Sequence, residues 1–313
     1  MKIYTKQFQS ATQAQCEYAG HKFIANYYSS VPTMQTIESL STSLIYEDIT
    51  AHGARTVTDV INHGIPVDLS HTFTELAKIA NIHAHRRFSE GGTIMFFVDR
   101  LERLDRLLDL KYDQWVAKNH DTTVNGLTVN TNQQLLTDVS QLIAKFRYGL
   151  CIPSQGDIHE RNIFNCGTII DFEGAGWNLL ATDLATFIWH TLVAGNYFGP
   201  LYAKWASDDD KHLFYSQRQQ IICHNNGKIE ILLNAPRAEL LKQFMEHFAG
   251  KIDQIDNTIW HQTAVAIVFR LLTTYSVNNM SPSDQHIIFA LSNYFFTNQY
   301  DDLPSKISQL LKV

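Results

Sequence analysis

The chain has 313 residues, of which 45% are hydrophobic and 18% are charged, and its formal net charge is −6 at pH 7. This length and composition predict a globular protein with a sizeable core and exclude extensive disorder. Because the acidic balance comes without a cluster of lysines and arginines, we expect no nucleic-acid surface, and a small polar or cationic partner is easier to accommodate.

The cysteines and the hydropathy of the sequence indicate the cellular compartment in which we expect the protein. The four cysteines, Cys16, Cys151, Cys166 and Cys223, form no C-x-x-C pair, so neither a zinc knuckle nor a disulfide framework is indicated. The first residues, MKIYTKQFQS, lack the apolar stretch of a signal peptide, and no apolar run is long enough for a membrane span. We therefore expect a cytoplasmic protein without a membrane partner.

In chain order, the first fifty residues predict a small α+β unit. Residues 3–8 favour a strand, and residues 11–27 have the spacing of a helix. After the break at Pro32, residues 34–40 and 44–49 predict two strands joined by a polar turn.

From Thr56 onward the pattern is mainly helical. Residues 72–85 are the clearest case, because their apolar side chains recur on one face. Two short hairpins interrupt the helices, at 163–170 and 220–233, each around a turn that contains asparagine and glycine. Further helices are predicted over 184–193, 237–248, 259–275 and 285–296.

Three polar residues lie around the first of these hairpins. The sequence Q-G-D-I-H-E-R-N runs from Gln155 to Asn162, and I-I-D-F-E runs from Ile169 to Glu173. A magnesium ion prefers hard oxygen ligands and leaves positions for phosphate, whereas an acceptor hydroxyl needs a carboxylate that orients it and takes its proton. Asn162 and Asp171 suit the first task and Asp157 the second, so the pattern indicates phosphoryl transfer.

This ordered set resembles the aminoglycoside phosphotransferase and choline kinase group of the protein-kinase-like superfamily, whose loop reads H-G-D-x-x-x-x-N and then hydrophobic-I-D-[WF]-E. The resemblance implies a two-lobe α+β fold, with a small N-terminal nucleotide-binding lobe over residues 1–48 and a large, mainly helical lobe over residues 49–313. It also implies an enzyme that uses Mg²⁺ and moves the γ-phosphoryl group of ATP to a hydroxyl of a small molecule, such as an amino sugar or aminoalcohol.

The same resemblance implies roles for residues near the hairpin. Asp157 corresponds to the catalytic aspartate, and Asn162 and Asp171 to the magnesium ligands. Gln155, Glu173 and Asp183 correspond to residues that support the loop and the metal region. Asp183 is equally well placed to cap the helix that follows it.

Nucleotide-binding residues are implied nearer the start of the chain. The backbone of Glu47, Asp48 and Ile49 corresponds to the hinge that binds adenine. Lys6 corresponds to the lysine that contacts the phosphates, with Lys2 as the alternative, and Glu17 in the first helix corresponds to its carboxylate partner.

Two features depart from the pattern of this family. No glycine precedes Gly20, so we expect a shortened N-terminal lobe without a glycine-rich phosphate loop. Gln155 stands where the family has a histidine, although glutamine can also donate and accept hydrogen bonds.

The alternative function is a catalytically weak pseudokinase that binds nucleotide or a protein partner. A protein kinase is disfavoured because the gap between Asp171 and the next predicted helix is too short for a long activation loop. The acceptor, the choice between ATP and GTP, and the oligomeric state stay open at this point.

Overall fold

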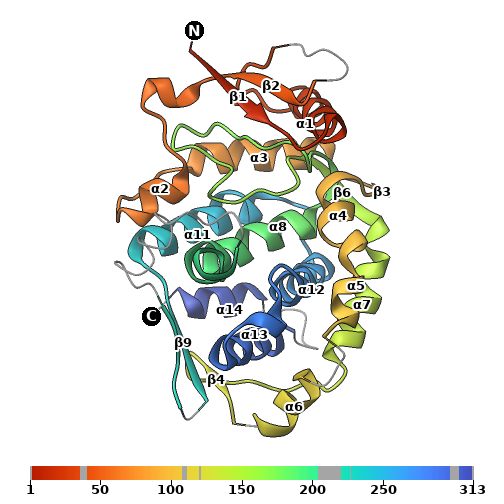
Figure 1. The fold of residues 1–313 in the computed structure, drawn as a ribbon, viewed down its shortest axis with the longest axis vertical. Helices are drawn as coiled ribbons and strands as arrows, with labels where there is room; N and C mark the ends of the chain where they lie inside the picture. The colour runs from red at the N-terminus through yellow and green to blue at the C-terminus, as the bar shows by residue number, and fades with distance from the viewer. Residues whose placement is uncertain are drawn as a thin grey trace.

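The structure is a computed structural model, and it describes residues 2–35, 41–107, 111–119, 121–203, 220–225, 227–296 and 303–311. Over these residues the fold is mixed α/β: helices predominate and the strands form small sheets (Figure 1). The predicted class is thus confirmed as a mixture of a few short strands with many helices.

The N-terminal unit consists of β1 (Ile3–Gln7), α1 (Ala11–Ile24) and β2 (Ser43–Glu47). Strands β1 and β2 are antiparallel, which places Lys6 opposite Leu44. The predicted first strand and helix are therefore confirmed, with slightly shorter bounds. Of the strand predicted over 34–40, Met34 forms an isolated bridge to Tyr46, and residues 36–40 lie outside the described residues.

A three-stranded antiparallel sheet leads into the candidate catalytic loop. Its order is β3 (His85–Phe88), β6 (Tyr148–Ser154) and β7 (Gly176–Leu179). The sequence pattern did not predict this sheet. Because β6 ends at Ser154, the loop that begins at Gln155 starts from a fixed strand end.

Most remaining elements form the helical body below the N-terminal unit (Figure 1). Helix α12 lies inside this body and packs against α8 and α13. The elements are η1 (Ile49–His52), α2 (Val57–Asn62), α3 (Ser70–His83), α4 (Gly91–Phe96), η2 (Val98–Arg100), α5 (Glu102–Asp105), α6 (Lys111–Lys118), β4 (Thr123–Val124), β5 (Leu127–Thr128), α7 (Leu135–Ala144), η3 (Lys145–Arg147), α8 (Leu180–Trp189), the π-helix η4 (His190–Phe198), α9 (Gly199–Tyr202), β8 (Gln220–Cys223), β9 (Lys228–Leu232), α11 (Ala235–His247), η5 (Ala249–Lys251), α12 (Asn257–Thr273), η6 (Val277–Asn279), α13 (Pro282–Phe295) and α14 (Leu303–Leu310).

Two predicted features differ from the structure. The hairpin expected at 163–170 is reduced to an isolated bridge between Ile163 and Ile169. Two backbone hydrogen bonds flank it, from the Phe164 amide to the Thr168 carbonyl at 2.9 Å and from the Ile170 amide to the Asn162 carbonyl at 3.0 Å. The helix expected from Leu184 begins already at Leu180 and continues as the π-helix η4. The second hairpin, β8 with β9, is confirmed as an antiparallel pair.

The buried apolar residues fall into two clusters. The larger one fills the helical body, where the rings of Phe187 and Phe244 stack with centroids 4.0 Å apart. The smaller one joins Ala14 and Leu44 of the N-terminal unit to Ile169 and Phe172. Because this second cluster includes residues on both sides of Asp171, burial of apolar surface fixes the Asp171 segment against the N-terminal unit.

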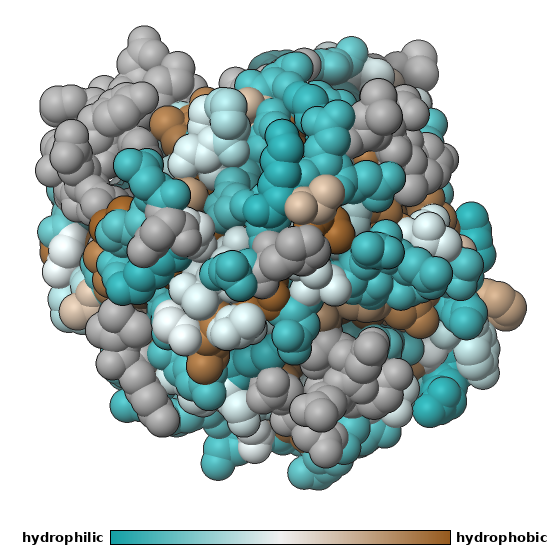
Figure 2. Space-filling view, turned by 90° about the horizontal axis from the view of Figure 1, so that it is seen from below, coloured by the Kyte–Doolittle hydropathy of each residue, from teal (hydrophilic) through white to brown (hydrophobic). Residues whose placement is uncertain are grey.

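Figure 2 shows the lower face of the molecule, below the helical body of Figure 1. Of the residues coloured on this face, the hydrophilic ones predominate, and the hydrophobic ones lie in small, separate patches (Figure 2). Among the described residues, no helix combines the length and the apolar character needed to cross a membrane.

Candidate functional site

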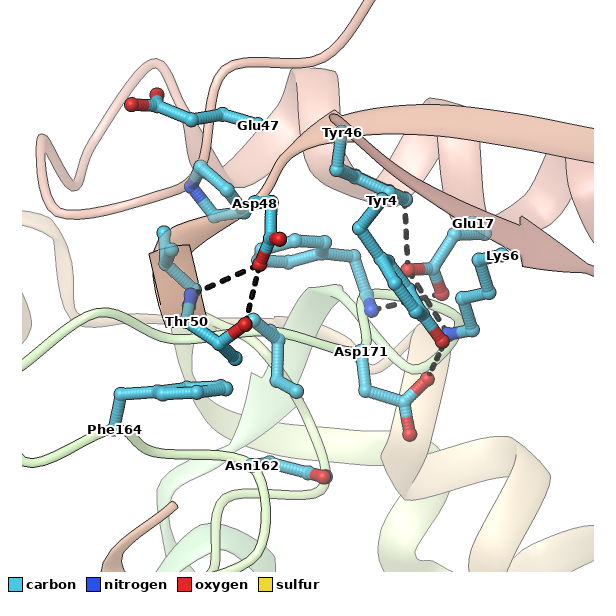
Figure 3. A pocket seen from close by; sticks show the side chains of 14 residues that line it. Tyr4, Lys6, Glu17, Tyr46, Glu47, Asp48, Thr50, Asn162, Phe164 and Asp171 are labelled. Carbon is cyan, nitrogen blue, oxygen red and sulfur yellow. Dashed lines mark hydrogen bonds and ion pairs between the residues drawn. The ribbon is translucent and has the colours of Figure 1, made fainter. Parts of the chain in front are cut away.

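A pocket of about 540 Å³ lies where the N-terminal unit meets the segment around Asp171 (Figure 3). One wall comes from β1, α1 and the end of β2, and the other from Asn162, at the end of the predicted catalytic loop, and from residues that follow it. Seven of the residues singled out from the sequence line it. The lining residues are Tyr4, Lys6, Glu17, Pro32, Tyr46, Glu47, Asp48, Ile49, Thr50, Asn162, Phe164, Ile170, Asp171 and Phe172.

Lys6 connects the two walls of this pocket. Its Nζ lies 2.5 Å from Oδ1 of Asp171 and 3.1 Å from Oε1 of Glu17. Burial alone would lower the pKa of Lys6, but the two carboxylates outweigh it and raise that pKa, so the ammonium group stays charged. Lys2, the alternative lysine, does not line the pocket.

Glu17 is held rigidly beneath Lys6. Its side chain is only 1% exposed, and it accepts hydrogen bonds from the Tyr46 hydroxyl and from the Phe172 amide, both at 2.9 Å. A buried carboxylate needs such partners, because an unsatisfied charge would be costly to desolvate. Glu17 therefore ties α1, β2 and the Asp171 segment to one lysine.

The Asp171 segment has an unusual backbone that Gln155 supports. Asp171 has φ +65°, a left-handed conformation that is uncommon for residues other than glycine and is often found at functional sites. The Gln155 side-chain amide donates to the carbonyls of Ile170, at 3.1 Å, and Asp171, and its Oε1 accepts from the Asp157 amide at 2.9 Å. Gln155 thus links the backbones of the two candidate aspartates.

Asn162 and Asp171 could hold a magnesium ion together with a phosphate. The Asn162 Nδ2 donates to the Asp157 carbonyl at 3.0 Å, and in Figure 3 its oxygen points toward the side of the pocket where Asp171 lies. Within the described residues, no group of three or more His, Cys, Asp or Glu side chains is placed to hold a metal alone. One carboxylate and one amide oxygen fit Mg²⁺ that also binds phosphate and water, which is how this ion is commonly held.

Asp157 lies beside the pocket, outside its lining, and is paired with an arginine that the sequence analysis missed. Its Oδ1 accepts from Arg270 at 2.6 Å, and its Oδ2 lies 3.6 Å from Nε2 of His159. Burial would raise the pKa of Asp157, but Arg270 and His159 outweigh it and lower that pKa well below its usual value. Asp157 is therefore a carboxylate at neutral pH.

Arg270 is built into the helical body. It is 4% exposed, and its guanidinium carbon lies 5.2 Å from the Phe96 ring centroid and 4.9 Å from that of Trp189. A single charge within the apolar run AVAIVFRLL of α12 is a signal that could have identified it, because such a charge is almost never fully buried without a partner.

Glu173 and Asp183 also lie outside the pocket lining. Glu173 is exposed over much of its side chain, and partial desolvation together with repulsion from Asp171 raises the pKa of its carboxyl group. Asp183 is 1% exposed, in the first turn of α8, and among the described residues its Oδ1 has no hydrogen-bond partner. Burial, and to a lesser degree Asp157, raise the pKa of Asp183 to about 7, although Ser154 opposes them.

The segment predicted to bind adenine lines the pocket, with part of its backbone already engaged. The Glu47 amide donates to the Thr33 carbonyl at 2.8 Å, and the Asp48 amide donates to the Lys2 carbonyl at 3.0 Å. The Asp48 side chain accepts from the Thr50 amide and hydroxyl, at 3.0 and 2.6 Å. The backbone amides of Glu47 and Asp48 are thus already bonded within the protein, and Ile49 follows them in the pocket lining.

No protein-family model and no curated protein sequence matches this chain. Among solved structures, a glucosamine kinase in complex with glucosamine, ADP and inorganic phosphate has a TM-score of 0.41 and 11% identity, over 99% of this chain and 74% of that one. The Plasmodium vivax ethanolamine kinase has a TM-score of 0.37 and 10% identity, over 93% of this chain and 74% of that one. At these TM-scores the similarity says nothing about what this chain binds, so its function has to come from the site.

Proposed function

We propose that this chain uses Mg²⁺ and ATP to phosphorylate a hydroxyl group of a small molecule. The observation that carries the proposal is the pair of contacts from Lys6 to Glu17 and to Asp171 at a pocket of about 540 Å³. A phosphoryl-transfer site needs a fixed lysine, a carboxylate that holds it and a metal-binding carboxylate close together. Here these three groups come from β1, α1 and the Asp171 segment.

In the proposed complex, the nucleotide base lies between the apolar side chains of the pocket. Pro32, Phe164 and Ile170 provide walls for a planar base, and Ile49 provides a backbone donor. The phosphates then extend toward Lys6, whose charge replaces part of their hydration. Residues 1–48 would form the nucleotide-binding lobe of this arrangement and residues 49–313 the lobe that holds the acceptor.

Three side chains would position the reacting groups. Asn162 and Asp171 would hold Mg²⁺, which when bound neutralises charge on the phosphates. The acceptor hydroxyl would hydrogen-bond to Asp157 and attack the γ-phosphorus, so that a new P–O bond forms as the bond to the β-phosphate oxygen breaks and ADP leaves. The hydroxyl proton would pass to Asp157.

Arg270 limits what Asp157 can do as a base. A carboxylate with a strongly lowered pKa is a weak proton acceptor, but it remains an effective orienting group. In a loose transition state the acceptor oxygen keeps its proton until bond formation is well advanced. We therefore assign Asp157 mainly to orientation of the hydroxyl and only late to acceptance of its proton.

The test compares two lysines of the same short N-terminal segment. Lys6→Met should weaken ATP binding in the presence of Mg²⁺ by about tenfold to a hundredfold, because it removes charge-assisted contacts to phosphate. Lys2→Met, outside the pocket, is the matched control and should bind ATP as the wild type does. Thermal stabilisation by ATP, with and without Mg²⁺, measures this difference.

ATP consumption with a panel of small alcohols then tests turnover. Consumption that depends on an acceptor and is lost in Lys6→Met supports the kinase. Binding that requires Lys6 without consumption for any acceptor would instead favour the catalytically weak pseudokinase. Equal ATP binding by both lysine variants would refute the assignment of this pocket.

A further inference from the structure

A second arginine lies beside the Asp157–Arg270 pair. Arg100 ends η2, and its guanidinium carbon lies 4.8 Å from the Phe96 ring centroid. Arg270 lies 5.2 Å from the same centroid, so the two guanidinium carbons are no more than about 10 Å apart. One aromatic ring thus anchors two cations next to the candidate catalytic carboxylate.

The charges of these two arginines are not equally compensated. Arg270 is paired with Asp157 at 2.6 Å, whereas Arg100 forms no ion pair with any described residue. Arg100 is half-buried, and its burial, together with repulsion from Arg270 and Arg103, lowers the pKa of its guanidinium to about 10. A partly desolvated cation without a partner is costly, and such cations commonly mark binding sites for anions.

The acidic groups near Arg100 do not remove this imbalance. Asp157 and Glu173 both attract Arg100, but neither lies within ion-pairing distance of it. Asp157 is already paired with Arg270, and the carboxylate of Asp171 repels that of Glu173. An anionic group of a bound ligand would therefore compensate the charge of Arg100.

We propose that Arg100 binds an anionic group, a carboxylate or a phosphate, of the same acceptor whose hydroxyl lies at Asp157. This inference rests on the proposed function and narrows its acceptor to hydroxy acids or phosphorylated alcohols. The planar guanidinium can donate two parallel hydrogen bonds to either anion, which gives orientation as well as attraction. Two fixed points, at Arg100 and Asp157, would select one hydroxyl of the acceptor.

Matched pairs of neutral and anionic alcohols provide the probes. Glycerol is compared with glycerate and with glycerol 3-phosphate, and glucose with gluconate and with glucose 6-phosphate. Their affinities for the full chain, saturated with ADP and Mg²⁺, are measured by ligand-observed NMR. We expect at least one anionic compound to bind more tightly than its neutral partner, and the comparison of carboxylates with phosphates identifies which anion is preferred.

Variants of two arginines connect that preference to the site. Arg100→Gln should weaken binding of the preferred anion by about tenfold to a hundredfold and leave the neutral partner unchanged. Arg100→Lys, which keeps the charge but loses the planar fork, should fall between them. Arg106→Gln is the matched control, because Arg106 is 69% exposed and paired with Glu102, and it should behave as the wild type.

Other outcomes would overturn the proposal. If no anion is preferred, or if Arg100→Gln weakens Mg-ATP binding but not anion binding, Arg100 only balances the local acidic groups. If Mg-ATP binds through Lys6 and a neutral acceptor is phosphorylated equally by Arg100→Gln, the anion site fails while the kinase function stands. Anion binding through Arg100 without ATP binding would contradict the proposed function and leave the anion site intact.

Discussion

Replacement of Asp183 by Asn should change how the stability of the protein depends on pH. Asp183 is 1% exposed, and its pKa is raised from 3.8 to about 7, chiefly by burial. Between its unfolded and folded pKa values, a carboxyl group whose pKa is raised on folding is neutral in the native state and ionised in the unfolded state. Its contribution to stability is therefore fully present below pH 3.8 and is lost as pH rises toward 7.

The size of this effect follows from the two pKa values. With 1.36 kcal/mol per pH unit, the free energy of unfolding of the wild type should fall by about 2.5 kcal/mol between pH 5 and pH 8 because of this group alone. Asp183→Asn cannot ionise. The difference in unfolding free energy between the variant and the wild type should thus grow by about 2.5 kcal/mol in favour of the variant over this range.

Urea denaturation at a series of pH values measures this difference. Asp253→Asn, at an exposed surface position, is the control and should change the unfolding free energy by less than about 0.5 kcal/mol at every pH. A stability difference for Asp183→Asn that does not vary between pH 5 and pH 8 would refute the reasoning, because Asp183 would then be ionised in the folded protein throughout.

Three further substitutions, one of them with a matched control, probe the loop and the helical body. In thermal denaturation, Gly156→Ala should destabilise the protein by at least about 3 kcal/mol, because a Cβ there would lie 1.9 Å from a carbonyl oxygen. Its control, Gly126→Ala, has a similar positive φ but open space around the Cβ and should cost about 1 to 2 kcal/mol. Arg237→Ala should cost about 3 to 5 kcal/mol by the same measurement, since it leaves the buried carboxylate of Glu160 without its arginine, and a loss below 1 kcal/mol would contradict this. Arg270→Gln removes the cation that lowers the pKa of Asp157, so the acidic limb of the pH–rate profile should move to higher pH. An acidic limb at the same pH as in the wild type would argue against the contact between Arg270 and Asp157 in solution.

The candidate site could be predicted in large part because its residues follow one another in a short, ordered segment. Asp157, Asn162 and Asp171 lie within fifteen positions, and their chemistry is recognisable from residue type and spacing alone. The family resemblance implied Lys6, with Lys2 as the alternative, and Glu17 as its partner, and the structure places Lys6 and Glu17 3.1 Å apart. Their roles as ligands of nucleotide and metal remain predictions.

The lone charge of Arg270 in an apolar run indicates that this residue needs a partner, but the identity of that partner, Asp157, depends on tertiary contacts that no spacing reveals. The position of Arg100 beside this pair likewise depends on tertiary packing. Arg270 is 113 positions from Asp157, and only the packing of α12 inside the helical body brings it to the loop. The sheet of β3, β6 and β7 was missed for a related reason. Its outer strands have four residues each, too few for a clear alternation, and their pairing partners are distant in sequence.

The π-helix η4 also left no recognisable signal. Residues 190–198, HTLVAGNYF, are mainly apolar and continue directly from α8, so their pattern is that of a buried helix. A change in the hydrogen-bonding register alters the backbone without requiring particular residue types.

The central claim is that Asp171 serves the nucleotide and Asp157 serves the acceptor. The most direct test measures Mg²⁺-dependent ATP affinity and phosphoryl transfer for Asp171→Asn and Asp157→Asn, with unfolding temperatures confirming that both variants fold. Asp171→Asn should lose affinity and transfer together, because it removes the anionic metal ligand. Asp157→Asn should keep its ATP affinity and lose transfer by about a hundredfold or more. Equal loss of ATP affinity in both variants, or full transfer activity in Asp157→Asn, would contradict the account.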